Sequence, residues 1–84
     1  MLVRYPIILE QGESSLEMAN MYYAHIPALG LTTHGDGVEA ARAAAIDLLT
    51  LWIAEKQAAG ESIAPVGEFL FSSVELEVDA LQSA

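Results

Sequence analysis

The chain has 84 residues, which is enough for one domain with one hydrophobic core. Its formal net charge is −9, from twelve acidic and three basic residues, and this argues against direct nucleic-acid binding, which needs Lys and Arg to neutralise phosphates. The same charge favours a basic protein partner, with solubility alone as the alternative. The sequence has no cysteine, which excludes disulfides, thiolate catalysis and Cys-ligated metals and favours a cytoplasmic location.

No apolar run is long enough to span a bilayer, and the first residues lack the features of a signal peptide, so we expect no membrane partner. The apolar fraction is nevertheless high, at 54%. Part of that surface is expected to close an oligomer or a partner interface, unless the many alanines simply inflate the count.

Three strands are predicted in the first half of the chain. Residues Leu2 to Glu10 are rich in β-branched and aromatic side chains and are predicted as a strand. Because proline cannot donate a ladder hydrogen bond, this strand either lies at an edge or has Pro6 where its missing N–H faces outward. Met21 to Ile26 is predicted to pair with it in antiparallel fashion, and the residues before Met21 either extend this strand or lie in a long hairpin loop. A turn at Pro27 to Gly30 then leads into a short third strand, Leu31 to His34.

The strongest local signal is a helix. Asp36 is predicted as its N-cap and Glu39 has the spacing of a capping box, while Gly60 is placed to end it. Apolar residues recur at three- and four-residue steps and form one stripe: Val38, Ala41, Ala45, Leu48, Leu49, Trp52 and Ile53.

After a loop held by Pro65, residues Phe69 to Val78 alternate apolar and acidic side chains, which predicts a last, half-buried strand. The expected order is therefore βββαβ. We predict an α+β domain in which an antiparallel sheet of three to four strands carries one helix on one face.

The two histidines are the main candidates for chemistry. A carboxylate at Asp36 close to His34 would suit general-base catalysis in a small hydrolase, but no nucleophile or oxyanion motif accompanies the pair. His25, His34 and Asp36 also lack recognised metal-ligand spacing. We therefore predict no enzyme activity, no metal and no cofactor.

Two features point to contacts with other proteins. Tyr22 and Tyr23 are predicted to lie on opposite faces of the second strand, so that one is in the core and the other exposed. Leu51 falls off the apolar stripe of the helix, and it is either an oligomer contact or an ordinary exposed leucine.

The sequence also resembles the HicB-like antitoxin family over most of its length. The resemblance lies in an ordered series of segments, none of which is specific alone. They are Tyr5-Pro6-Ile7-Ile8-Leu9-Glu10, Tyr23-Ala24-His25-Ile26-Pro27-Ala28-Leu29, Thr33-His34-Gly35-Asp36-Gly37-Val38-Glu39-Ala40, the Leu- and Trp-containing helix, and Gly60-Glu61-Ser62-Ile63-Ala64-Pro65.

The resemblance implies a partial RNase H-like βββαβ fold and a protein that neutralises a small basic ribonuclease toxin of the HicA type by covering its active surface. On this view residues 1–84 form a single HicB-like domain, without the separate DNA-binding domain that many members carry. The expected partners are a basic toxin and further copies of the chain, as a dimer or tetramer. Candidate toxin contacts are Glu10, Glu13, Glu17 and Tyr22 or Tyr23. The alternatives are an orphan HicB-like module that binds another protein or only itself, and the hydrolase that would use His34 and Asp36.

Overall fold

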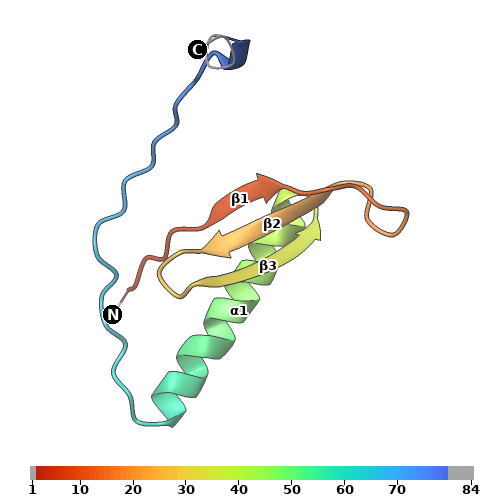
Figure 1. Cartoon of the computed structure of the whole chain (residues 1–84). Helices are drawn as coiled ribbons and strands as arrows, with labels where there is room; N and C mark the ends of the chain where they lie inside the picture. The colour runs from red at the N-terminus through yellow and green to blue at the C-terminus, as the bar shows by residue number, and fades with distance from the viewer. Residues whose placement is uncertain (1, 80–84) are drawn as a thin grey trace.

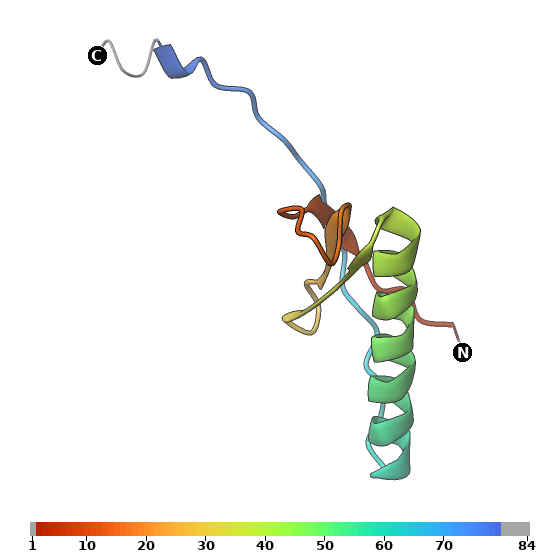
Figure 2. The same cartoon turned by 90° about the vertical axis from the view of Figure 1, so that its right-hand side faces the viewer.

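The computed structural model describes residues 2–79 and has an α+β architecture. Strands β1 (Ile8–Gln11), β2 (Met21–Ile26) and β3 (Leu31–Asp36) form one antiparallel sheet in the order β1-β2-β3, and helix α1 (Val38–Ala58) follows. The helix covers one face of the sheet and leaves the other open (Figures 1 and 2). The predicted α+β class, with its antiparallel sheet and single helix, is thus confirmed.

The second strand has the predicted bounds, whereas the other two differ. β1 begins at Ile8 and not at Leu2, because Pro6 has no N–H to give to a ladder. The residues before it turn toward the helix instead, where the Tyr5 ring meets Trp52 edge-on at 6.4 Å between centroids. β3 continues to Asp36, two residues beyond the predicted end, because its pairing with β2 extends to Met21.

The start of the helix differs from the sequence prediction. Gly37 is the N-cap and no side chain caps the helix, so the predicted Asp36 N-cap and Glu39 capping box are wrong. Asp36 still belongs to β3, and its Oδ1 accepts a hydrogen bond from the Asn20 backbone N–H at 3.2 Å. The chain turns directly from strand to helix at Gly37, whose φ of 94° suits glycine.

The predicted end of the helix is confirmed. Gly60 has a positive φ of 75°, its N–H bonds to the Gln57 carbonyl, and the Glu61 N–H bonds to the Lys56 carbonyl. These two bonds form a Schellman motif, which satisfies carbonyls that the last turn leaves free. Lys56 adds an ion pair to Glu61 at 2.7 Å and lies over the Trp52 ring.

The core is small and lies between the helix and the middle of the sheet. Its buried side chains are Ala24 and Ile26 of β2 and Ala41, Ala45 and Leu49 of α1. Gly35 of β3 faces the helix so closely that a Cβ there would overlap the backbone of Ala40 and Ala41. Small residues on both elements therefore allow the helix and the sheet to approach closely.

The predicted last strand is not formed. Residues 61–77 contain no strand, and Leu70, Phe71, Val74, Leu76 and Val78 are largely exposed. The segment passes the N-terminal residues and then runs away from the sheet (Figure 1). Alternation of apolar and acidic residues defines two faces, but a strand also needs a neighbour with which to exchange a ladder of backbone hydrogen bonds. Within the described residues the sheet contains only β1, β2 and β3, and this segment pairs with none of them.

Between residues 2 and 79, no helix combines the length and the apolar character that crossing a membrane requires.

Candidate functional site

The sheet face that the helix leaves uncovered is the main candidate for function, and we call it the open face. Side chains alternate along each strand, so the register decides which of them share this face. One row across the sheet is Ile8, His25 and Thr32, and the next is Glu10, Tyr23 and His34. The surface that results consists mainly of polar and aromatic groups, with Ile8 as an exposed apolar member, and all three strands contribute to it.

A hydrogen-bonded chain orders the centre of the open face. His25 Nε2 lies 2.8 Å from Glu10 Oε1, and His25 Nδ1 lies 2.9 Å from Thr32 Oγ1. A carboxylate only accepts, so Nε2 carries the hydrogen in this bond. In the neutral ring Nδ1 then accepts from the Thr32 hydroxyl. One imidazole thus links β1, β2 and β3 and holds the Glu10 carboxylate in place.

Tyr23 lies beside this chain of hydrogen bonds. Its ring centroid is 6.1 Å from that of His25, with 33° between the two ring planes. The ring also approaches Gly12 so closely that a Cβ there would lie 2.9 Å from its edge. Glycine at position 12 therefore leaves space for the aromatic ring on the surface.

The five predicted contact residues fall in three places. Glu10 and Tyr23 are cross-strand partners on the open face. Tyr22 lies on the other side of the sheet and packs against the core, as the prediction of opposite faces required. Glu13 and Glu17 lie on the loop between β1 and β2, which projects beyond the end of the sheet (Figure 1).

That loop carries one side chain that the sequence reading missed. Leu16 stands between Glu13 and Glu17 in the chain and is fully exposed. The loop turns back on itself at this point, where the Met18 N–H donates to Ser15 Oγ at 3.0 Å. The sequence does carry a signal for an exposed apolar residue at this position, because Leu16 stands in a Ser-rich turn between two glutamates. The sequence prediction left the residues before Met21 either in an extension of the second strand or in the hairpin loop, and the structure places Leu16 in the loop.

The arrangement around His34 does not favour hydrolytic chemistry. Asp36 has the Asn20 N–H as its partner, and the histidine that does bond to a carboxylate is His25. His34 is not among the residues that line the three pockets on the N-terminal segment, the helix and residues 61–71. The residue lies on the flat open face, where a substrate would stay in contact with bulk water.

Candidate metal ligands are also dispersed. Within residues 2–79, no three His, Asp or Glu side chains gather closely enough to hold an ion. Leu51, the predicted oligomer contact, lies on the helix with 58% of its surface exposed and is not part of the open face.

The open face is therefore suited to recognition of a surface. It presents an aromatic ring, two imidazoles and carboxylates on a hydrogen-bonded sheet, with its central side-chain hydrogen bonds already formed. Such groups anchor protein interfaces because they bring contact area and directed hydrogen bonds with little loss of entropy.

Comparison with protein-family models, curated proteins and solved structures finds no match for this chain.

Proposed function

We propose that this protein is a HicB-like antitoxin whose open face binds and neutralises a small basic ribonuclease toxin. The observation that carries the proposal is the uncovered sheet face, with Glu10, Tyr23, His25 and His34 side by side, in a chain of net charge −9. The ordered series of HicB-like segments supplies the class of partner. The three strands and helix are compatible with the partial RNase H-like fold that this resemblance implies.

Charge provides the first step of binding. The protein attracts a basic partner over distances near the Debye length, and this raises the association rate constant most at low salt. Glu13 and Glu17 on the projecting loop extend the acidic surface beyond the end of the sheet. Close contact is then made by the open face, where Tyr23 supplies apolar area and Glu10 accepts hydrogen bonds from Lys or Arg.

Neutralisation follows from coverage. A ribonuclease of this kind needs a basic surface on which RNA phosphates lie, because phosphate contacts dominate the affinity for nucleic acid. A bound acidic sheet takes the place of those phosphates. The antitoxin then needs no catalytic group of its own, and inhibition scales with the occupancy of the complex.

The proposal is tested by expressing the chain with a short basic protein encoded beside it and by measuring both complex formation and RNA cleavage. We expect co-purification and loss of cleavage. If no basic protein is encoded nearby and none co-purifies from the native host, the orphan HicB-like module takes the place of the antitoxin.

Charge reversal on the open face gives a sharper test. Glu10→Lys changes the net charge from −9 to −7, removes the bond to His25, and is expected to slow association about tenfold at low salt. Glu55→Lys makes the same charge change on an exposed part of the helix and serves as the matched control. Equal association rates for the two variants, measured by surface plasmon resonance, would contradict a binding site on the open face.

A further inference from the structure

A second surface, on the helix side of the molecule, lacks a partner within the described residues. A groove of about 610 Å³ runs between the N-terminal residues and α1. We call it the helix groove, and the residues that matter here are Arg4, Ile7, Arg42, Ile46, Leu49 and Ile53. It exists because α1 lies mainly across β3 and β2 and hardly touches β1.

The helix groove concentrates the positive charge of an acidic protein. Arg4 and Arg42 are two of only three basic residues in the chain, and both lie at this groove. Neither makes an ion pair with another described residue. Most of the other residues that line the groove are apolar, and Ile46 among them is 41% exposed. An occupant that fits this surface has an apolar row flanked by carboxylates.

The C-terminal tail of the chain, residues 69–79, has that chemistry. Val74, Leu76 and Val78 are 78%, 67% and 58% exposed, and Glu75 and Glu77 alternate with them. In an extended conformation the three apolar side chains share one face and the glutamates the other. The apolar row matches the floor of the helix groove, and the carboxylates match its two arginines.

The dimensions of the chain indicate that this tail is uncovered. The protein exposes 6704 Å², whereas a compact monomer of 9.0 kDa exposes about 4,900 Å². Its radius of gyration is 17.0 Å, against about 12 Å for a compact domain of this length. The exposed apolar side chains of the tail contribute to this excess area of about 1,800 Å² for the whole chain, and a stable interface takes roughly 800 Å² from each partner.

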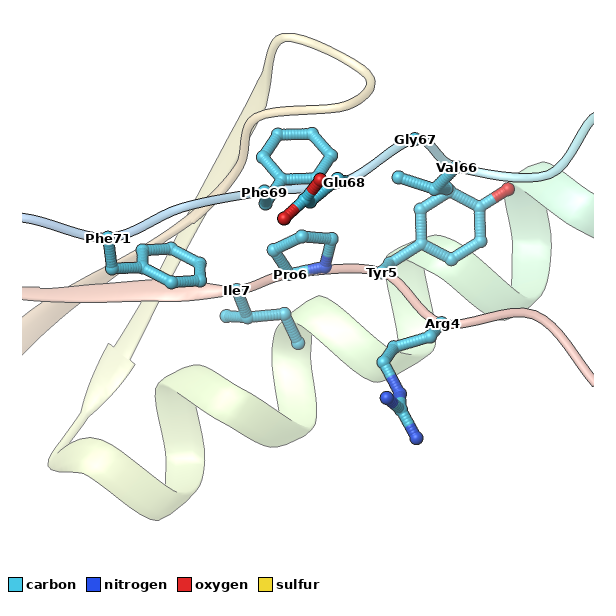
Figure 3. A pocket seen from close by; sticks show the side chains of 9 residues that line it. All are labelled: Arg4, Tyr5, Pro6, Ile7, Val66, Gly67, Glu68, Phe69 and Phe71. Atoms are coloured by element: carbon cyan, nitrogen blue, oxygen red, sulfur yellow. The ribbon is translucent and has the colours of Figure 1, made fainter.

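The tail does not reach its own helix groove. Residues Val66 to Phe71 pass along the N-terminal segment, where Phe71 lies near Ile7, while the Arg4 side chain points away from the tail (Figure 3). The N-terminal segment therefore separates the tail from the groove. Beyond Phe71 the tail leaves the domain (Figures 1 and 2).

We propose that the tail of one copy binds in the helix groove of a second copy, with Val74, Leu76 and Val78 on its apolar floor and Glu75 and Glu77 beside Arg4 and Arg42. Exchange of both tails gives a closed, twofold dimer, because each copy donates one tail and accepts one. The dimer leaves the open face free, since that face lies on the opposite side of the sheet. The inference does not depend on the proposed toxin.

Light scattering coupled to size-exclusion chromatography tests the exchange. The full chain is expected to elute as a dimer at micromolar concentration. Leu76→Asp is expected to raise the dimer dissociation constant by at least about a hundredfold, because each dimer buries this side chain twice. Leu51 is the rival oligomer contact predicted from the sequence, and it lies on an exposed part of the helix outside the groove. Leu51→Asp is therefore expected to leave a tail-exchanged dimer intact. A monomeric full chain, or a dimer that Leu51→Asp disrupts and Leu76→Asp does not, overturns the proposal.

Disulfide crosslinking distinguishes a tail that binds the groove of a second copy from a tail that folds back into the groove of its own chain. The native chain has no cysteine, so Leu76→Cys in one copy and Ile46→Cys in an isotope-labelled second copy are unique reporters. When the two variants are mixed and mildly oxidised, we expect a disulfide-linked product that contains one copy of each. Its yield should be well above the yield from the control pair, in which Leu51→Cys replaces Ile46→Cys. If the double variant Leu76→Cys/Ile46→Cys instead closes a disulfide within a monomer, the tail occupies its own groove and the proposal is wrong.

Discussion

At the scale of single residues, two glycines with different roles support the domain. Gly35 lies in β3 beneath the helix, where a Cβ would overlap the backbone of Ala40 and Ala41. Gly12 borders the Tyr23 ring on the open face. In both cases the missing side chain allows a close approach, and at Gly35 the neighbour is backbone that cannot rotate away.

Gly35→Ala is therefore expected to lower the free energy of unfolding by about 1–3 kcal/mol through overpacking between sheet and helix. Gly67→Ala is the matched control, because a Cβ there meets nothing within 4 Å and the backbone φ is not positive. Thermal or urea unfolding followed by circular dichroism measures both variants. Equal stabilities for the two would show that the helix does not press on β3 at this point.

At the scale of helices and strands, the junction of β3 and α1 is where the N-cap preference predicted the wrong residue for the start of the helix. Asp36 has the side chain of a good N-cap, but it completes the ladder to Met21 and bonds to the Asn20 N–H. The cap position falls one residue later, at Gly37, with φ 94° and ψ 165°. Only glycine adopts this backbone conformation without strain.

Gly37→Ser introduces a residue with a better capping side chain, yet it is expected to destabilise the protein by about 1–3 kcal/mol because of backbone strain. Asp36→Ala removes one exposed hydrogen bond and is expected to cost less, about 0.5–1.5 kcal/mol. Chemical denaturation of both variants measures which of them loses more free energy of unfolding. A larger loss for Asp36→Ala would restore Asp36 as the cap.

For the molecule as a whole, two surfaces on opposite sides of the sheet have separate roles in our proposals. The open face meets a basic toxin, and the helix groove receives the tail of a second copy. Among the residues that the structure describes, the hydrophobic core contains only five buried side chains. A core of this size gives a single copy of the chain little stability. Exchange of tails adds buried apolar area that a single chain cannot supply.

The midpoint of thermal unfolding is consequently expected to rise with protein concentration, because association stabilises the folded state by mass action. Leu76→Asp is expected to abolish this dependence and leave the midpoint at its dilute value, since Leu76 is exposed in the single chain. Differential scanning calorimetry over a wide concentration range measures the effect. A midpoint independent of concentration for the unaltered chain would contradict the dimer.

The sequence by itself determined the features that depend on neighbours along the chain. The strand-favouring residues of β2, the apolar stripe of α1 and the glycine at position 60 each predict an element or its end, and all three predictions are confirmed. The separation of Tyr22 from Tyr23 followed in the same way, because adjacent residues of a strand face opposite sides.

Tertiary structure decided whatever depends on a partner distant in sequence. Pairing with β2 placed His25 between Glu10 and Thr32, a set of contacts that no spacing along the chain reveals. It also carried β3 on to Asp36 and so moved the helix cap to Gly37. The pattern in residues 69–78 specified two faces but not a neighbour, and because a strand is stable only through hydrogen bonds to another strand, the tail remained unpaired.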